Sequence, residues 1–178
     1  MSLEGLSYVV TIKEDIHSRD LRIIGCEDSE IFINSAVRSL YVVNCVNCTI
    51  YIGACERIAF VDKCEKISFT VATNLLRVCN THESNVYYYG PSPIVLTGDN
   101  KALALGPNNS PSPELPRHLK AANVPQHPQH AKKYEEVLFK QRPNDDKSWT
   151  TMTPKEFDLL VLPEKEEDDG RGKGNSKG

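Results

Sequence analysis

The sequence predicts an all-β protein, a parallel β-helix, because short apolar runs recur along it in two series that share one period. The first series begins at residues 21, 40, 58, 76 and 94, so its spacing is 19, 18, 18 and 18 residues. The second series occupies residues 31–33, 50–52, 67–69, 86–88 and 103–105. A repeat of 18–19 residues suits one coil with three short sides, which gives about five coils between residues 21 and 105.

The runs in each repeat are short, rich in β-branched and aromatic residues, and bounded by turn-forming asparagines and glycines, which is typical of strands. A repeat of this length cannot hold a strand together with a crossover helix, which needs about 30 residues. The third side of each coil carries the weakest signal. We place it near Ala36-Val37, Ala54-Cys55 and Ala72.

Alternation along each strand decides which side chains fill the interior of the coils. Leu76 and Val78 point inward, so Arg77 between them points outward. In the adjacent coils the column neighbours of Arg77 are predicted to be Tyr41, Ala59 and Val95. None of these is a carboxylate, so we expect no salt bridge within the column to neutralise Arg77.

The chain divides into four parts. Residues 1–20 are expected to form an incomplete first coil around the run 8–12, and residues 21–107 the β-helix itself. Residues 108–163 are expected to pack on this core as a proline-rich extended connector up to Pro128, followed by short helices. The helices are placed at 133–140 and after the capping box that begins at Thr153. The charged residues 164–178 are expected to be disordered.

Composition bounds the function. The net charge of −3 argues against a nucleic-acid surface, for which basic stripes are typical. No apolar run approaches the ~20 residues of a membrane-spanning helix, and no secretory signal is expected. His118, His127 and His130 are interpreted as solvated residues of the proline-rich segment rather than metal ligands.

Three of the six cysteines, Cys26, Cys45 and Cys64, are 19 residues apart, so they are expected to form a column at one corner of the coils. We interpret them as reduced, buried thiols that pack as small hydrophobic groups. Cys45 and Cys48 form a Cys-x-x-Cys pair, but a closed zinc site needs four ligands and no second pair has suitable spacing. We therefore expect no metal and no cofactor.

Aromatic side chains are the candidate binding residues. Phe32, Tyr51 and Tyr87 occupy outward positions of the second series, and Tyr41 an outward position of the first. Two interpretations stay open: a surface ladder that packs on itself, or a docking face for a protein partner.

Arg77 is the candidate for chemistry, because no nucleophile–base motif and no glycine-rich phosphate loop is visible. An outward arginine on a rigid strand is what an arginine finger requires, since its planar fork can meet the phosphate oxygens of a partner's nucleotide. The alternative is an ordinary surface arginine like Arg22.

The segment Ala72-Thr73-Asn74-Leu75-Leu76-Arg77-Val78 resembles the Ala-Cys-Gln-Gln-Leu-Arg-Ile segment of tubulin-binding cofactor C (TBCC, or C-CAP) domains. The resemblance implies a right-handed parallel β-helix in which Arg77 matches a GTPase-activating arginine finger. Residues 94–103, 114–115 and 149–163 are further similar to one subgroup, TBCC domain-containing protein 1. The likeness covers roughly residues 20–163.

Where the family has two glutamines, this sequence has Asn74 and Leu75. Asn74 is a candidate substitute for positioning the finger, whereas the Leu75 side chain forms no hydrogen bonds. The subgroup resemblance implies a non-catalytic interaction or scaffold domain of the cytoplasm and cytoskeleton. It implies action at the centrosome or basal body and in Golgi positioning, with protein components of those bodies as partners.

Two alternatives stay open. The first is a GTPase-activating domain for tubulin or an Arf-like small GTPase, with Arg77 as the finger and Asn74 as its positioner. The second is actin binding, by analogy with the related β-helix of adenylyl cyclase-associated proteins. A monomer or a weak dimer is expected, and an enzyme only under the first alternative.

Overall fold

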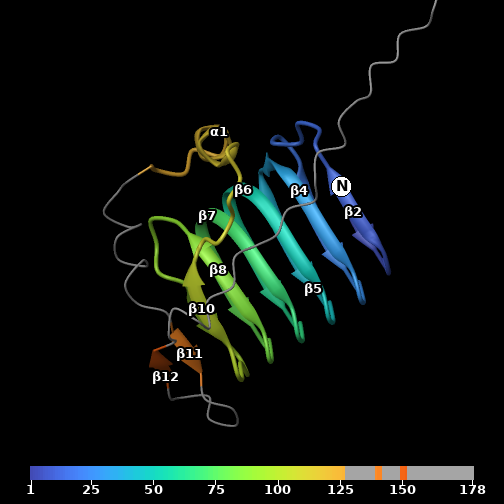
Figure 1. The fold of residues 1–178 in the computed structure, drawn as a ribbon, viewed down its shortest axis with the longest axis vertical. Helices are drawn as coiled ribbons and strands as arrows, with labels where there is room; N and C mark the ends of the chain where they lie inside the picture. The colour runs from blue at the N-terminus through green and yellow to red at the C-terminus, as the bar shows by residue number, and fades with distance from the viewer. Residues whose placement is uncertain (127–138, 142–148, 152–178) are drawn as a thin grey trace, which may run out of the picture.

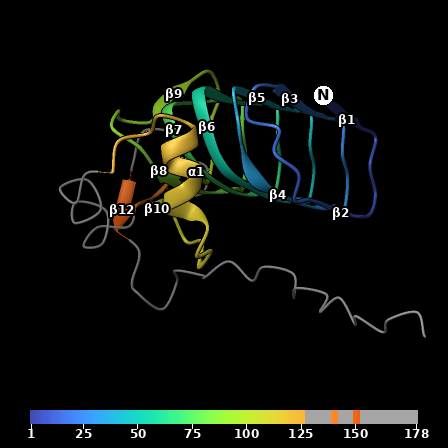
Figure 2. The same cartoon turned by 90° about the horizontal axis from the view of Figure 1, so that it is seen from above.

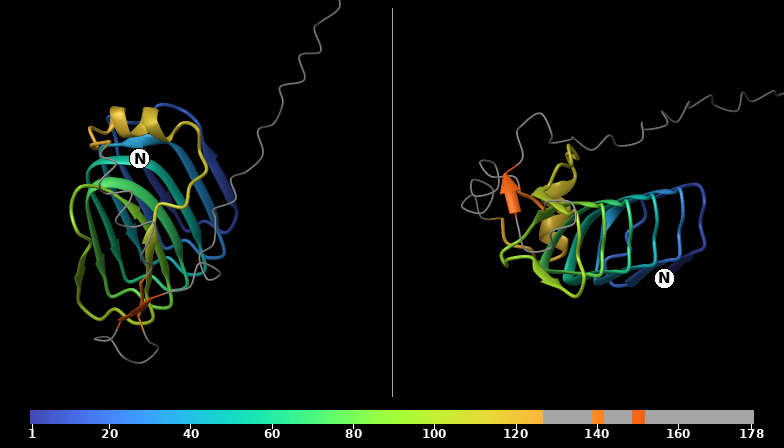
Figure 3. Two further views of the ribbon diagram at one scale, coloured as in Figure 1. Left: turned by 60° about the vertical axis from the view of Figure 1, so that its left-hand side comes forward. Right: turned by 90° about the horizontal axis from the view of Figure 1, so that it is seen from below.

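The computed structural model describes residues 1–126 and, for the backbone alone, residues 139–141 and 149–151. Its parallel strands wind into a stack of coils, so the predicted β-helix class is confirmed (Figure 1). The coils lie side by side from the N-terminal end, drawn in blue, to β10, drawn in yellow-green. Figure 3 shows them as loops around one interior.

One side of the stack, the first wall, is built from strands that pair in parallel from coil to coil. Its strands are β1 (Ser2–Glu4), β3 (Asp20–Ile24), β5 (Ser39–Val43), the second half of β6 (Thr49–Asp62), the second half of β7 (Ser68–Cys79) and β9 (Val95–Thr97). The register aligns Leu21 with Leu40, Leu40 with Ala59, and Ala59 with Leu76. Neighbouring strands in such a ladder are about 4.8 Å apart.

The second wall is built in the same way. Its strands are β2 (Val9–Ile12), β4 (Glu30–Val37), the first halves of β6 and β7, β8 (Asn85–Tyr89) and β10 (Ala104–Pro107). The long strands β6 and β7 bend from the second wall into the first. β2 pairs with β4 and β1 with β3, so the first coil contributes a strand to both walls.

Two antiparallel strands continue the second wall at the C-terminal end of the stack. β11 (Phe139–Gln141) pairs with β10, and β12 (Trp149–Thr151) pairs with β11. The predicted helix over 133–140 is therefore wrong at residues 139–140, where pairing with the edge of β10 satisfies the backbone instead. The rest of that helix, the helix placed after Thr153 and the tail 164–178 lie outside the described residues.

The inward side chains of both walls form one core. Leu21, Leu40, Leu76 and Val78 have no exposed surface. Each coil is one strand thick along the stack axis, so its aliphatic side chains are fully buried only when the coils before and after it cover them. Full burial of a large aliphatic side chain contributes roughly 1.5–3 kcal/mol.

The coils turn sharply at two corners whose residues have positive φ, a conformation that glycine and asparagine adopt most readily. One column of such residues is Gly25, Asn44, Lys63, Asn80 and Gly98, and the other is Asp28, Asn47, Lys66, Glu83 and Ala102. The recurrence of these corners at equivalent places gives every coil the same outline.

The predicted cysteine column lies between these corners. Cys26, Cys45 and Cys64 are buried and unpaired, and each thiol faces a carbonyl oxygen of the preceding coil, as Cys45 Sγ does at 3.7 Å from Ile23 O. Elsewhere in the core, burial raises the pKa of the Cys55 thiol to about 11.

Within the described part of the chain no His, Cys, Asp and Glu cluster is placed to hold a metal ion. No helix there is long and apolar enough to cross a membrane.

A helix covers the third side, which carries the predicted alanine column. α1 (Leu115–Ala121) packs on Ala36, Ala54 and Ala72 through Leu119, and lies across the coils beside β6 (Figure 2). The predicted extended connector is therefore wrong over residues 115–121. Pro116 stands in the first helical turn, where its missing N–H costs no hydrogen bond, so a proline-rich sequence still starts a helix there.

The contact between α1 and the coils depends on a glycine. The ring of His118 approaches Gly53 so closely that a Cβ atom at residue 53 would clash with it and lie 2.8 Å from the Ser35 carbonyl oxygen. The prediction that His118 is solvated is thus wrong, since α1 turns it onto the coils and leaves it 3% exposed.

Leu76→Ala is expected to lower the free energy of unfolding by about 2–5 kcal/mol, because it leaves a cavity in the shared core. Leu75→Ala, one residue earlier on the outer surface, is the matched control and is expected to cost under ~0.5 kcal/mol. Chemical denaturation of both variants measures the difference. Equal losses would contradict the assignment of inward and outward residues.

His118 makes stability depend on pH. Burial, and secondarily Arg117, lower its pKa below the usual 6.5, although Glu114, a backbone hydrogen bond to Asn34 and Asp15 oppose the shift. The unfolded chain therefore binds the proton more readily, and the free energy of unfolding is expected to fall as the pH drops below about 6.5.

Urea unfolding at about pH 7.5 and about pH 5.5 measures this effect. His118→Gln should remove it, whereas His17→Gln, at an exposed histidine, should keep it. An unchanged pH dependence in His118→Gln would show that other groups cause it.

Candidate functional site

Arg77 lies in the outward column of the first wall. The register aligns Arg22 with Tyr41, Tyr41 with Phe60, Phe60 with Arg77, and Arg77 with Val95. The outward direction of Arg77 is thus as predicted, and so are Tyr41 as a member of its column and Val95 as a neighbour.

The predicted neighbour Ala59 is wrong. Ala59 is fully buried and faces the core, and Phe60 takes its place beside Arg77. The cause is an irregularity between β6 and β7: Cys55 pairs with Thr73 but Ile58 pairs with Leu75, so β6 holds one extra residue. This bulge shifts the later pairs by one position relative to a strict count of the repeat.

Arg77 is held by side chains from the coils on either side of it. Its guanidinium carbon lies 5.7 Å from the centre of the Phe60 ring, a cation–π contact. Its Nε donates a hydrogen bond of 3.2 Å to Thr97 Oγ1 in the next coil. Tyr41 meets the same phenylalanine edge-on, with ring centres 6.4 Å apart. Among the described residues no carboxylate forms an ion pair with this exposed guanidinium.

Exposed apolar side chains flank the arginine. Leu75, two residues before it, is 36% exposed, and Val95, beside it in β9, is 40% exposed. They share the outer surface of this wall with Tyr41 and Phe60. We call the set Tyr41, Phe60, Leu75, Arg77 and Val95 the Arg77 face.

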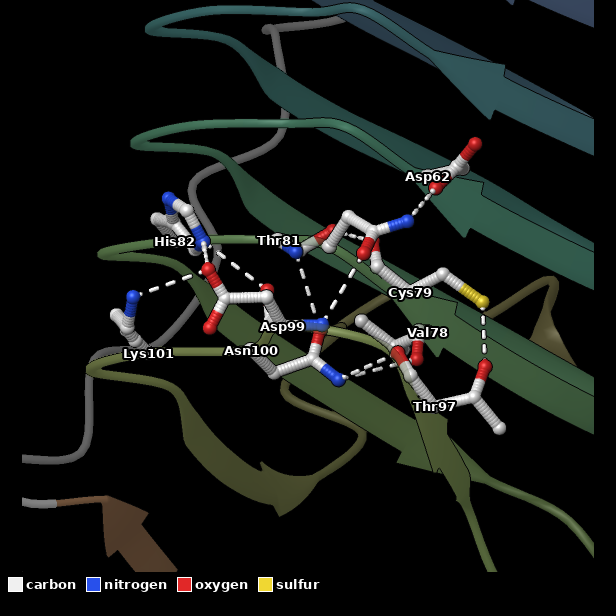
Figure 4. A network of polar contacts seen from close by, with 10 residues as sticks. Asp62, Val78, Cys79, Thr81, His82, Thr97, Asp99, Asn100 and Lys101 are labelled. Carbon is white, nitrogen blue, oxygen red and sulfur yellow. Dashed lines mark hydrogen bonds and ion pairs between the residues drawn. The ribbon is translucent and has the colours of Figure 1, made fainter. Parts of the chain in front are cut away.

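A polar network fixes the end of the first wall next to this face (Figure 4). Thr97 Oγ1, the acceptor of the Arg77 bond, also lies 2.7 Å from Cys79 Sγ. Asn80 donates to Asp62 at 2.8 Å, so this carboxylate of the neighbouring strand is engaged by Asn80. Asn100 Oδ1 accepts the Thr81 backbone N–H at 3.0 Å, which joins the last two coils. The network therefore anchors the strand ends that carry Arg77 and Thr97.

Comparison with known proteins identifies the family. Residues 18–137 match the family described as tubulin binding cofactor C, which is more than half of the chain and includes the whole Arg77 face. The chain belongs to the tubulin binding cofactor C family. Two relatives of this TBCC domain are TBCC domain-containing protein 1 from Xenopus tropicalis and from Rattus norvegicus.

The likeness to these relatives is distant and partial. The Xenopus protein is 22% identical over 143 residues, 80% of this chain and 26% of that protein. The rat protein is 24% identical over 139 residues, 78% of this chain and 24% of that protein. The TBCC domain described here thus spans about a quarter of the length of the curated relatives it matches.

Asn74, the candidate positioner in this TBCC domain, has other partners in the structure. Its Nδ2 donates to the Glu56 carbonyl oxygen at 2.7 Å and to the Asn123 carbonyl oxygen at 3.3 Å. These bonds tie the third side to the end of α1. Within residues 1–126 no hydrogen bond joins Asn74 to Arg77, and a positioning role for Asn74 stays a prediction.

The aromatic residues of the second wall are not on the surface. Phe32, Tyr51 and Tyr87 are 5%, 1% and 3% exposed, so the prediction of surface aromatics is wrong for these three. They do face away from the core, in one column with Thr70. The segment between β10 and α1 lies on this column, since Thr70 Oγ1 donates to Asn109 Oδ1 at 2.7 Å. Tyr41 is half-buried on the first wall.

Phe60 and Thr97 are site residues that the sequence did not reveal. Both lie in coils next to Arg77, so the repeat itself was the available signal. A count of 19 residues from Tyr41 reaches Phe60, and 20 residues beyond Arg77 reaches Thr97. The bulge in β6 hid the first. Alternation places Thr97 on the same face as Val95, two residues earlier, but it does not show that Thr97 accepts a hydrogen bond from Arg77.

Proposed function

We propose that this TBCC domain is a non-catalytic protein-interaction module and that a protein partner docks on its Arg77 face. The observation that carries the proposal is that two exposed apolar side chains, Leu75 and Val95, lie near the Arg77 cation on one wall. Contiguous exposed apolar groups usually mark a contact surface. Arginine and aromatic side chains are enriched where such contacts contribute most to binding.

The absence of catalysis is supported by the residues beside Arg77. Leu75 stands where the family motif has a glutamine, and it offers no hydrogen bond. Asn74 stands at the other glutamine, but its amide is already donated to two backbone carbonyls. A partner can therefore bind at this face, but neither Leu75 nor Asn74 has a free side-chain donor to orient a nucleotide or a water molecule for catalysis.

The place of action follows from the resemblance to the TBCC domain-containing protein 1 subgroup. We propose that the domain works in the cytoplasm at the centrosome or basal body, on a cytoskeletal partner, and contributes to Golgi positioning. Tubulin is the first partner to test, because the family description names it.

Leu75→Ser is expected to weaken binding to purified tubulin dimers about tenfold and to reduce enrichment at the centrosome, since it removes an apolar contact from the Arg77 face. Val46→Ser is the matched control, because Val46 is 37% exposed, as Leu75 is 36%, but lies at a distant corner. The proposal would be refuted if the wild-type protein did not bind tubulin and was distributed diffusely in cells.

GTPase activation is the second candidate function, and one observation favours it. Arg77 is exposed, has no carboxylate partner in the described part of the chain, and is braced by Phe60 and Thr97. A finger supplied in trans in this way can accelerate GTP hydrolysis by about 10³–10⁵.

Single-turnover GTP hydrolysis by tubulin and by an Arf-like GTPase separates the two functions. We expect the same rate without the domain, with wild type and with Arg77→Ala. An acceleration of about 10³ or more that Arg77→Ala abolishes would establish activation and overturn the non-catalytic proposal.

A further inference from the structure

Three arginines of consecutive coils stack at one corner. Arg19, Arg38 and Arg57 are 19 residues apart. The Arg38 backbone N–H donates to Arg19 O and that of Arg57 to Arg38 O, both at 2.9 Å, so the three residues stack in consecutive coils. We call them the arginine column. It stands at the edge where the third side meets the first wall.

Most of the positive charge in this column is unpaired. Arg38 binds Asp20 through two hydrogen bonds of 2.9 and 2.8 Å. Arg19 and Arg57 are exposed, and neither side chain has a hydrogen bond or ion pair with any residue of 1–126, although the charge of Arg57 helps to lower the pKa of Asp20. Like charges in directly opposed strand positions repel. An anion bound along the column would relieve that repulsion.

That the column consists of arginines rather than lysines indicates which kind of anion it would bind. Two lysines, Lys63 and Lys66, lie at the two positive-φ corners, one at each, and Lys66 pairs with its neighbour Glu65 at 3.2 Å. The arginine column instead offers planar forks, which match carboxylates and phosphates in two-point contacts. Arg38 already holds a carboxylate in this way, and its hydrogen bonds lower the pKa of Asp20 to about 2.

The surroundings of the column favour a protein as the source of the carboxylates. The first wall begins directly beside it, and partly exposed Ile58 follows Arg57 there. A protein segment supplies acidic and apolar side chains together, whereas a nucleic-acid backbone or a lipid headgroup layer supplies mainly charge. Arg19 and Arg57 are about 10 Å apart, which three residues of extended chain span.

We propose that the arginine column binds a carboxylate-rich, extended segment of a partner protein, with Arg19 and Arg57 each taking one acidic side chain. The segment runs along the stack axis, and Arg38 stays paired with Asp20. This surface is separate from the Arg77 face and needs neither Arg77 nor a GTPase, so it goes beyond the proposed function.

The test measures binding of a fluorescein-labelled peptide with six consecutive glutamates by anisotropy at low ionic strength. The double variant Arg19→Gln/Arg57→Gln is expected to bind about tenfold more weakly than wild type. The control is the double variant Lys63→Gln/Lys66→Gln, which removes the same amount of charge about 20 Å along the coil from Arg57. It should change the affinity for the peptide less than about twofold. Circular dichroism and thermal unfolding check that both variants stay folded.

Three results would overturn the proposal. They are no binding of the peptide to wild type, equal weakening in both double variants, and tighter binding to phosphatidylserine vesicles than to the peptide. The first would show that the column does not bind an acidic peptide. The second would show that net charge alone explains the binding, and the third would assign the column to a membrane surface. Arg77→Ala should bind the peptide as wild type does, so failure of the Arg77 face leaves this inference standing.

Discussion

Every coil in this protein depends on its neighbours for both hydrogen bonds and burial. A strand of the first wall pairs with the strands before and after it, and its inward side chains pack in one core with those of the opposite wall and of adjacent coils. This constraint forces coils of nearly equal length with corners in equivalent places. The positive-φ residues at the corners and the matched aliphatic columns both follow from it.

The same constraint explains why much of the fold was predictable. Coils that stack need similar residues at equivalent positions, so the repeat period is visible in the sequence. The fold class, the two walls, the cysteine column and the outward direction of Arg77 could therefore be predicted. Local exceptions to the period were not. One extra residue in β6 moved Phe60, instead of Ala59, next to Arg77. Nothing in the apolar pattern marks such a bulge.

Features that arise from distant segments were also hidden. The alternation around Tyr51 gave its direction correctly, but not the burial that leaves it 1% exposed. Prolines suggested an extended chain near Pro116, yet the alanine column offered Leu119 a surface and a short helix formed. In both cases tertiary packing decided the outcome, and a single sequence carries little record of it.

The candidate site is a product of stacking as well. Phe60, Arg77 and Thr97 come from three coils, and no local motif contains them. The helix α1 is placed by a similar logic, because the alanines beneath it belong to consecutive coils. Since hydrogen bonds between coils run along the stack axis, tension on that axis would part the coils one after another. The helix α1 packs across several coils and holds them together, so the middle of the stack should separate at a higher force than its N-terminal end.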